Sequence, residues 1–219
     1  MTISVSIRPV EMSDADCVQR YAADVRLHAT CNLPSPYPEG GAASFIDLTL
    51  KANDAGKQFT FAVLNSGEFV GLIGLNDVHL EERTAELDYW IGFPFWNRGI
   101  ATCAASLAIG YAFQSIGLQT LFSSALIRNP ASLRVLEKNG FIKVGEHFYN
   151  GLWKDRFRGE MLARHRILKF EHPPNQRIEC SGPCRSPHER ASRRLSDDET
   201  PWHHRQRPRR LRAVDREAR

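Results

Sequence analysis

Ala85-Glu-Leu-Asp-Tyr-Trp-Ile-Gly-Phe-Pro-Phe-Trp-Asn-Arg-Gly-Ile-Ala-Thr-Cys-Ala-Ala105 is the stretch that decides the fold, because an apolar strand runs through a tight turn directly into a helix. Its first residues alternate β-forming side chains with the carboxylates of Glu86 and Asp88. Pro94 has no N–H to donate and ends the strand. From Gly99 onward, apolar residues recur every three or four positions, which predicts a helix.

The start of this helix is a predicted phosphate site. The first turn of a helix leaves backbone N–H groups unpaired and carries a partial positive charge, so it attracts anions. Small residues at Gly99 and Ala101 let a phosphate approach these donors, and Arg98 can add a full charge.

A second motif, Asn129-Pro-Ala-Ser-Leu-Arg-Val-Leu-Glu-Lys-Asn-Gly-Phe141, follows a short apolar strand. Pro130 at its start and Gly140 just past its end bracket a helix of two to three turns, which Asn129 can cap. Asn129 and Ser132 are three residues apart, so both are expected to point toward the end of the preceding strand.

Residues 96–101, Trp-Asn-Arg-Gly-Ile-Ala, resemble the pyrophosphate-binding motif of the GNAT superfamily of N-acetyltransferases, which is Gln/Arg-x-x-Gly-x-Gly/Ala. Trp96 stands at the Gln/Arg position, as in the RimJ/RimL-like branch, and the second motif resembles the family's Asn-x-x-Ser/Ala segment followed by Gly-Phe. The resemblance covers roughly residues 5–166 and implies acetyl-CoA as co-substrate. Its expected binding residues are Trp90, Ile91, Trp96, Asn97, Arg98, Gly99, Ile100, Ala101, Thr102, Asn129 and Ser132.

The remaining chain alternates strand and helix patterns. Strands are predicted over residues 4–10, 58–64, 69–78, 118–126, 144–148 and 154–167, and helices over 13–29, 41–53, 99–116 and 130–138. This order indicates a mixed α/β (α+β) fold. The resemblance implies the GNAT fold, a single central, mixed, mostly antiparallel twisted sheet of about six to seven strands flanked by about four helices. A V-shaped splay between two central strands is expected to admit the pantetheine arm of CoA.

The charge distribution divides the chain of 219 residues into a body and a tail. Up to residue 170 there are 17 Lys and Arg against 17 Asp and Glu, whereas residues 171–219 contain 12 Arg, no Lys and 8 acids, which accounts for the net charge of +4. We expect an acetyltransferase domain over 1–168 and a disordered Arg/Pro-rich tail over 169–219, because the tail has too few apolar residues to offset the entropy of ordering.

Composition also limits the partners. The Arg-rich tail could bind nucleic acid non-specifically, but its interspersed acids make this unlikely as a strong site. No segment has the length of a membrane span or the pattern of a signal peptide, so a cytoplasmic protein without membrane association is expected. The five cysteines are scattered and lack metal-ligand spacing, so no metal is expected. Both a monomer and a homodimer are compatible with the sequence.

Acetyl transfer needs a base for the amine, and Glu86 and Asp88 share one face of their strand. Either carboxylate could accept the ammonium proton, directly or through water, and attract a cationic acceptor. The resemblance favours Glu86, since family members often hold a Glu on this strand. The alternative is a solvated strand face that pairs with Arg83 or Lys138.

Two further groups complete the expected chemistry. Backbone N–H groups near Trp90 and Ile91 could polarise the thioester carbonyl, an effect that can lower a barrier by about 3 kcal/mol. Many GNAT members place a Tyr seven residues after the Asn to protonate the thiolate, but here that residue is Leu136. Ser132 is the replacement that the RimJ/RimL-like branch suggests; the alternative is a Ser that only caps its helix.

The sequence therefore predicts an N-acetyltransferase that moves the acetyl group of acetyl-CoA to a primary amine by direct attack in a ternary complex. The acceptor could be a protein N-terminal alanine or serine, or a small amine such as a polyamine or an aminoglycoside. The alternative from a different class is a non-catalytic acyl-CoA-binding regulatory module, which Leu136 at the Tyr position leaves open.

Overall fold

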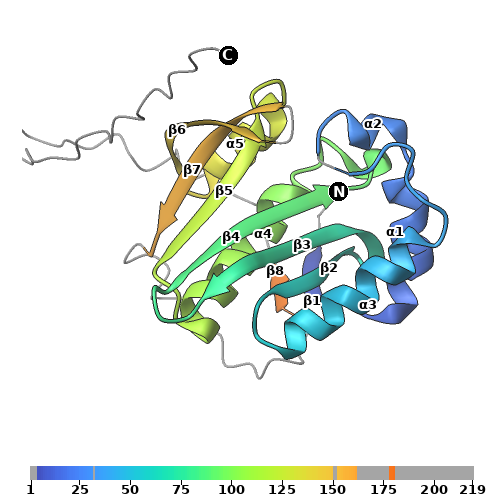
Figure 1. Ribbon diagram of the computed structural model, residues 1–219, viewed down its shortest axis with the longest axis horizontal. Helices are drawn as coiled ribbons and strands as arrows, with labels where there is room; N and C mark the ends of the chain where they lie inside the picture. The colour runs from blue at the N-terminus through green and yellow to red at the C-terminus, as the bar shows by residue number, and fades with distance from the viewer. Residues whose placement is uncertain (1–3, 32, 150–151, 162–177, 181–219) are drawn as a thin grey trace, which may run out of the picture. The chain divides into compact units, whose positions relative to one another are not determined.

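The computed structural model describes residues 4–31, 33–149, 152–161 and 178–180. These residues form one sheet of eight strands in the order β6-β7-β5-β4-β3-β2-β1-β8 (Figure 1). All neighbouring strands are antiparallel except β4 and β5. The strands are β1 (Val5–Pro9), β2 (Phe59–Asn65), β3 (Glu68–His79), β4 (Thr84–Ile91), β5 (Thr120–Leu126), β6 (Ile142–Tyr149), β7 (Leu152–Glu160) and β8 (Ile178–Cys180).

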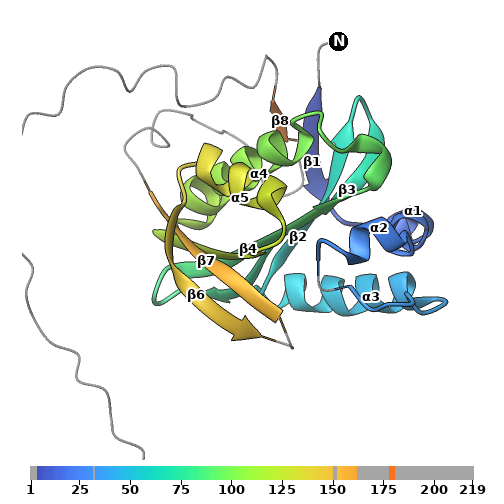
Figure 2. The ribbon, with the colours of Figure 1, turned by 90° about the horizontal axis from the view of Figure 1, so that it is seen from above.

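Helices cover both faces of the sheet. Figure 2 shows α1 (Ala15–Ala22), α2 (Val25–His28) and α3 (Gly41–Asp54) on one face, and α4 (Ile100–Tyr111) and α5 (Pro130–Lys138) on the other. Single short turns precede α1 (Met12–Asp14) and α4 (Phe93–Phe95), and a π-helical turn, Ala112–Ile116, continues α4. The architecture is the mixed, mostly antiparallel sheet that the sequence predicts, with an eighth strand at one edge.

The two central strands β4 and β5 pair over only three residues each. Thr84–Glu86 lie beside Thr120–Phe122, and beyond them the strands diverge (Figure 1). β4 stays paired with β3 as far as Ile91, and β5 stays paired with β7 as far as Leu126. The predicted V-shaped splay is therefore confirmed, and it opens at the carboxyl ends of both strands.

Gly71 explains how β3 and β4 remain close at the splay. A Cβ atom at this position would lie 2.2 Å from the Trp90 carbonyl oxygen, so any side chain would force the strands apart. The β2–β3 register also shifts beside Gly71, between Val63 and Leu64. The close backbone approach or bulge that this glycine predicts is thus present, and it fixes the position of Trp90.

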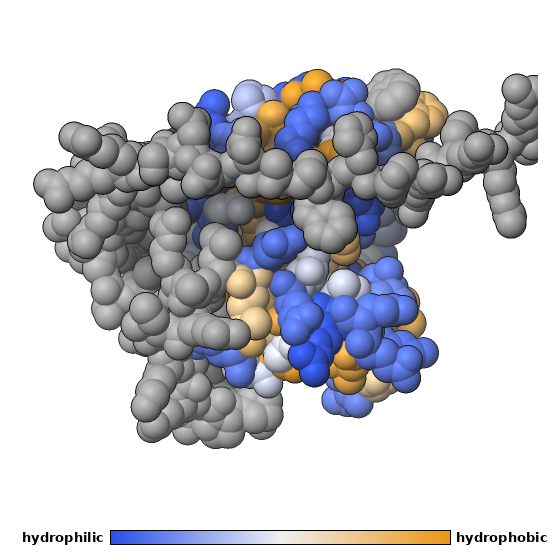
Figure 3. Space-filling view, turned by 90° about the vertical axis from the view of Figure 1, so that its left-hand side faces the viewer, coloured by the Kyte–Doolittle hydropathy of each residue, from blue (hydrophilic) through white to orange (hydrophobic). Residues whose placement is uncertain are grey.

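β6 lies at the opposite edge of the described sheet from β8, and it contains both apolar and charged residues. Ile142 and Phe148 are more than half exposed, and the Nζ of Lys143 lies 2.8 Å from Glu146 Oε1. Figure 3 looks onto the side where β6 and β7 lie, and its coloured residues are mostly hydrophilic with hydrophobic ones among them. Charges on an edge strand disfavour pairing with another chain.

The structure corrects the predicted helix over residues 13–29. Asp24 adopts an extended conformation (φ −71°, ψ 118°) between α1 and α2, and its Oδ1 accepts a hydrogen bond of 2.9 Å from the backbone N–H of Arg26. The carboxylate of a short side chain such as Asp can accept hydrogen bonds from nearby backbone N–H groups in place of the helix carbonyl groups. Asp24 therefore caps a new helix where the apolar spacing alone predicts a continuous one.

The tail and the last hairpin also differ from expectation. Ile178–Cys180 form β8 and pair with Val5–Ile7 of β1, so the predicted disorder of 169–219 is wrong for these three residues. The last strand, predicted to end at 167, is described as far as Glu160. The other tail residues, and the rest of the predicted last strand after residue 161, lie outside the described part of the chain.

Candidate active site

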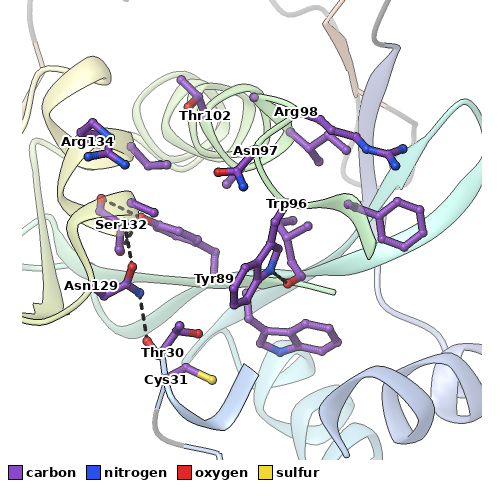
Figure 4. A pocket seen from close by; sticks show the side chains of 18 of the residues that line it. Thr30, Cys31, Tyr89, Trp96, Asn97, Arg98, Thr102, Asn129, Ser132 and Arg134 are labelled. Atoms are coloured by element: carbon purple, nitrogen blue, oxygen red, sulfur yellow. Dashed lines mark hydrogen bonds between the residues drawn. The ribbon is translucent and has the colours of Figure 1, made fainter. Parts of the chain in front are cut away.

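A cavity of about 340 Å³ lies at the splay of β4 and β5, between the start of α4 and α5 (Figure 4). All residues that the sequence assigns to the cofactor line it: Trp90, Ile91, Trp96, Asn97, Arg98, Gly99, Ile100, Ala101, Thr102, Asn129 and Ser132. These residues come from a strand end and two helix starts, which the fold brings to one place. We call this space the anion cavity, for the charges described next.

The start of α4 has the geometry of an anion-binding turn. Gly99, the N-cap, has φ +76° and Asn97 has φ +60°, so the chain makes a sharp left-handed turn into the helix. The N–H of Cys103 donates to the Gly99 carbonyl at 3.1 Å, which leaves the preceding N–H groups of the first turn without partners in the helix. Gly99 is needed here because a Cβ atom is strained at this φ.

Three cations line the anion cavity, and its described lining contains no carboxylate. Arg98 precedes α4, and its guanidinium carbon lies 5.8 Å from the centre of the Phe95 ring. Arg134 and Lys138 lie one turn apart on α5. The sequence analysis did not assign these two, although their i, i+4 spacing places them on one helix face. Three cations beside a helix start suit a ligand with several phosphates.

Asn129 connects α5 to the opposite wall of the anion cavity (Figure 4). Its Oδ1 accepts a hydrogen bond of 3.2 Å from the Ser132 N–H, the predicted cap, and its Nδ2 donates to the Thr30 carbonyl at 3.1 Å. Thr30 follows α2, so one side chain joins two segments that are far apart in sequence. This contact fixes the width of the cavity beside Ser132.

Tyr89 is a candidate functional residue that the sequence analysis did not assign. Its hydroxyl lies 2.8 Å from Ser132 Oγ and donates to the Ser132 carbonyl at 3.3 Å (Figure 4). Burial, the largest cause, raises the pKa of Tyr89 above its ordinary value, so the hydroxyl keeps its proton at neutral pH. Leu136, at the usual Tyr position of the family, is fully buried in the core.

A second cavity of about 640 Å³ lies on the sheet face toward α3, and we call it the acceptor cavity. Glu86 and Asp88 both line it, as their shared strand face predicts. Ser124 Oγ donates to Glu86 Oε1 at 3.1 Å, and Asn76 Nδ2 donates to Asp88 Oδ2 at 2.9 Å. The further lining residues are Cys31, Leu33, Phe45, Gln58, Thr60, Leu72, Ile73, Gly74, Tyr89, Trp90, His147, Lys154 and Arg156.

The two cavities meet at Tyr89 and Trp90, which line both of them together with Cys31. Side chains alternate along a strand, so a regular strand would present only one of Tyr89 and Trp90 to the opening, yet both line it. The reason is the splay, because β5 no longer covers the side of β4 beyond Glu86. Residues from both faces of β4 can therefore reach the opening.

Asp88 lies nearer to Trp90 along β4 than Glu86, the carboxylate that the family resemblance favours. A strand rises about 3.3 Å per residue, so Asp88 is roughly 7 Å along β4 from Trp90, and Glu86 is roughly 13 Å from it. Water reaches the Asp88 side chain, but the surrounding protein and then the charge of Glu86 raise its pKa, against the opposing effects of Asn76 and Lys154. A carboxylate with a raised pKa is a stronger base than an ordinary one.

The geometry of β4 also indicates which backbone N–H, that of Trp90 or that of Ile91, is free to donate to a thioester carbonyl. The Gly92 N–H donates to the Val70 carbonyl at 2.8 Å, and alternation in an antiparallel pair turns the Trp90 N–H toward β3 as well. The Ile91 N–H then faces the splay. The Ile91 carbonyl, on that same side, accepts a hydrogen bond of 2.6 Å from the Trp96 indole. Of the two predicted carbonyl polarisers, Ile91 is the one whose N–H faces the opening.

The segments and charges around the two carboxylates delimit the acceptor cavity. Residues 34–38 do not line the acceptor cavity; its wall on that side comes from Leu33, which precedes them, and from Phe45 of α3. Among the described residues, neither carboxylate of β4 has an ion pair with Arg83 or Lys138 within 4 Å.

A sheet splayed between two central strands, with a cationic cavity on one side of the opening and carboxylates on the other, is the arrangement expected of an acyl-CoA-dependent transferase. Comparison with known proteins agrees, since the family profile of the Acetyltransferase (GNAT) domain matches residues 4–142. The chain belongs to the GNAT family of N-acetyltransferases, and it is an acyltransferase.

Several relatives have names that specify an acceptor. The chain is 28% identical over 182 residues to a spermidine N(1)-acetyltransferase of Escherichia coli, covering 80% of this chain and 94% of that one. It is 32% identical over 106 residues to a putative ribosomal N-acetyltransferase, YdaF, of Bacillus subtilis, covering 47% and 58%. These relatives bear different acceptor names, so the family alone does not decide the acceptor.

Solved structures share the fold. RimJ of Mycobacterium smegmatis, solved with CoA-disulfide, superposes with a TM-score of 0.65 at 24% identity, covering 75% of this chain and 84% of that one. Spermidine N-acetyltransferase of Vibrio cholerae, solved with CoA and spermine, gives 0.60 at 21% identity, covering 70% and 92%. In the described part of this chain, the helices are too short or too polar to cross a membrane.

Proposed function

We propose that this protein transfers the acetyl group of acetyl-CoA to a primary amine by direct attack in a ternary complex. The observation that supports it best is the meeting, at Tyr89 and Trp90, of a cavity lined by three cations with a second cavity that contains two carboxylates. The anion cavity suits the phosphates of CoA, and the carboxylates of the acceptor cavity suit an ammonium group. The acceptor is a protein N-terminus or a small amine, as in the relatives.

In this mechanism the protein binds the diphosphate and orients the thioester. The first-turn amides of α4 hold the diphosphate together with Arg98, Arg134 and Lys138. Acetyl-CoA supplies the acetyl thioester, and the Ile91 N–H donates to its carbonyl oxygen, where negative charge develops. Binding at both ends of CoA in this way positions the acetyl carbon at the junction of the two cavities.

The proton transfers are assigned to side chains at that junction. Asp88 accepts the proton of the acceptor ammonium, and Glu86 beside it helps to keep the Asp88 pKa raised. The neutral amine attacks the acetyl carbon, the new C–N bond forms and the C–S bond breaks. Tyr89 donates its proton to the departing thiolate and regains one from the acetylated nitrogen, and Ser132 orients the Tyr89 hydroxyl.

The direct test is release of free CoA thiol from acetyl-CoA across peptide N-termini, polyamines and aminoglycosides, beside a calorimetric titration with CoA. We expect binding with turnover on at least one acceptor class. CoA binding without turnover on the whole panel would favour a non-catalytic acyl-CoA-binding module. Absence of CoA binding would refute the assignment of the anion cavity.

A further inference from the structure

The hydrogen-bond donors to the carboxylates of the acceptor cavity are uncharged, although the charge of Lys154 acts on Asp88. Glu86 accepts its hydrogen bond from the Ser124 hydroxyl and Asp88 accepts its own from the Asn76 amide, and both donors are uncharged. Within the described residues, no arginine forms an ion pair within 4 Å of either carboxylate. The β4 side of the cavity is therefore an anionic end that an ammonium group can occupy.

The opposite side of the same cavity, formed by β7, is cationic. Lys154 and Arg156 both line it from one face of the strand. The Arg156 guanidinium carbon lies 4.9 Å from the centre of the Phe122 ring. Within the described residues, no carboxylate oxygen comes within 4 Å of Arg156, whereas the next arginine on this face, Arg158, pairs with Glu160 at 3.3 Å. Arg156 thus presents a charge to the cavity without an acidic partner in the described protein.

The strand register sets the separation of the two ends. Arg156 lies opposite Ser124 of β5, and the Ser124 hydroxyl bonds to Glu86 of β4. Adjacent strands are roughly 4.8 Å apart, so the backbones of β7 and β4 are roughly 10 Å apart, and more where β4 and β5 diverge. An acceptor that touches both ends must carry its two charged groups several bonds apart.

We propose that the acceptor of this enzyme carries a negatively charged group on the same molecule as its amine, and that Arg156 binds this group. The inference rests on the proposed function and names the class of its acceptor. Such a molecule places its ammonium at Asp88 and its anion at Arg156, which fixes its orientation. A polyamine would bring a second ammonium toward Arg156 and Lys154, and like charges repel in a partly enclosed site.

The negative charge comes either from an acidic residue near a peptide N-terminus or from the carboxylate of a small amino acid. Two substrate pairs distinguish these sources. The tripeptide amides Ser-Gly-Glu-NH2 and Ser-Gly-Gln-NH2 differ only in the side-chain charge, and 4-aminobutanoate differs from butylamine in its carboxylate. Spermidine serves as the polycationic comparison, and kcat/KM is measured for each acceptor with saturating acetyl-CoA.

We expect the anionic member of at least one pair to be preferred by about tenfold or more, as for a charge-assisted hydrogen bond, with spermidine below it. The Arg156→Gln variant should lose this preference to within about twofold, and Arg156→Glu should invert it toward Ser-Gly-Lys-NH2. Arg158→Gln is the matched control, since Arg158 lies on the same strand face but does not line the cavity, and it should keep the preference. Thermal unfolding of each variant checks that it folds.

The outcomes separate this inference from the proposed function. Turnover with equal rates within both pairs, or with spermidine as the best acceptor, would overturn the inference and leave the acetyltransferase assignment intact. If no acceptor turns over, calorimetric binding of the same pairs to the CoA-saturated protein decides. A preference for the anionic member that Arg156→Gln abolishes would support the cationic end while refuting the proposed reaction, and binding without preference would refute both.

Discussion

At the residue scale, Tyr89 is where the two cavities and the two helix motifs come together. Its hydroxyl contacts Ser132, and its ring borders both the anion and the acceptor cavity. The tyrosine position on α5 is held by Leu136, which is buried and has no polar group. A hydroxyl from β4 can therefore occupy the place of one from α5, and its distance from Ser132 fits this role.

We expect Tyr89→Phe to lower kcat by about 100-fold while KM for acetyl-CoA changes by less than about twofold, because the variant loses the acid for the thiolate and keeps the ring. Steady-state kinetics with CoA thiol release measures this. Tyr111→Phe is the control, since Tyr111 packs against Phe59 and Phe61 and lines neither cavity. Equal losses in both variants would assign Tyr89 to packing.

The raised pKa of Asp88 predicts how kcat/KM depends on pH. Asp88 must be deprotonated to act, so kcat/KM should rise as pH increases through its raised pKa. Asp88→Asn should lose about 100-fold or more in kcat/KM. Glu86→Gln should lose less and move the acidic limb to lower pH, because it removes a charge that raises the Asp88 pKa. An unshifted limb in Glu86→Gln would contradict this assignment.

The raised pKa of Asp88 also predicts that the Asp88→Asn variant is more stable than the wild type at neutral pH. A native pKa above the unfolded value means that the folded protein binds the proton more tightly, so this group's contribution to the free energy of unfolding falls as pH rises from its ordinary value of 3.8 through the raised pKa. Asp88→Asn removes this effect. Urea unfolding should find the variant more stable than the wild type at pH 7.5, with the difference shrinking toward about pH 4.

At the element scale, the anion cavity depends on how the chain enters α4. Gly99→Ala should cost roughly 1–2 kcal/mol of stability, because its φ is left-handed, and it should weaken CoA binding by about tenfold or more by turning the first-turn amides. Calorimetry measures the affinity. Gly117→Ala is the matched control. Gly117 also has a left-handed φ, +82°, and it has open space for a Cβ atom. It follows the π-helical turn that continues α4, and it lines neither cavity.

These two glycine variants separate strain from binding. Both should lose similar stability, and only Gly99→Ala should lose CoA affinity. Equal affinities in the two variants would mean that the α4 start does not bind the diphosphate. The comparison is informative because both positions demand a left-handed residue while only one of them borders the anion cavity.

At the scale of the whole molecule, every described site residue precedes residue 162. A chain ending at residue 189 retains all of these residues, so it should keep kcat/KM within about twofold of the full-length value. A chain ending at 170 also lacks β8, which pairs with β1, and should unfold at a lower temperature while remaining active when folded. A loss of activity at unchanged unfolding temperature in either chain would contradict this.

Local pattern was sufficient for much of the site. The spacing of residues 96–101 and of Asn129 to Ser132 predicts two helix starts, and both line the anion cavity as expected. Period-two alternation places Glu86 and Asp88 on one face. These features are local, because a turn, a cap or a strand face is fixed by residues within a few positions of one another.

Contacts between distant segments were decided only by the tertiary structure. Tyr89 and Ser132 are 43 residues apart, and Arg156 reaches the acceptor cavity from a strand paired two positions away from β4. β8 joins β1 across more than 170 residues. The sequence determined the family, the sheet and the glycine turn into α4, because each of these follows from short-range periodicity and backbone chemistry. The contact between Tyr89 and Ser132 and the cationic end of the acceptor cavity depended on strand order and splay, which arise from the packing of the whole sheet.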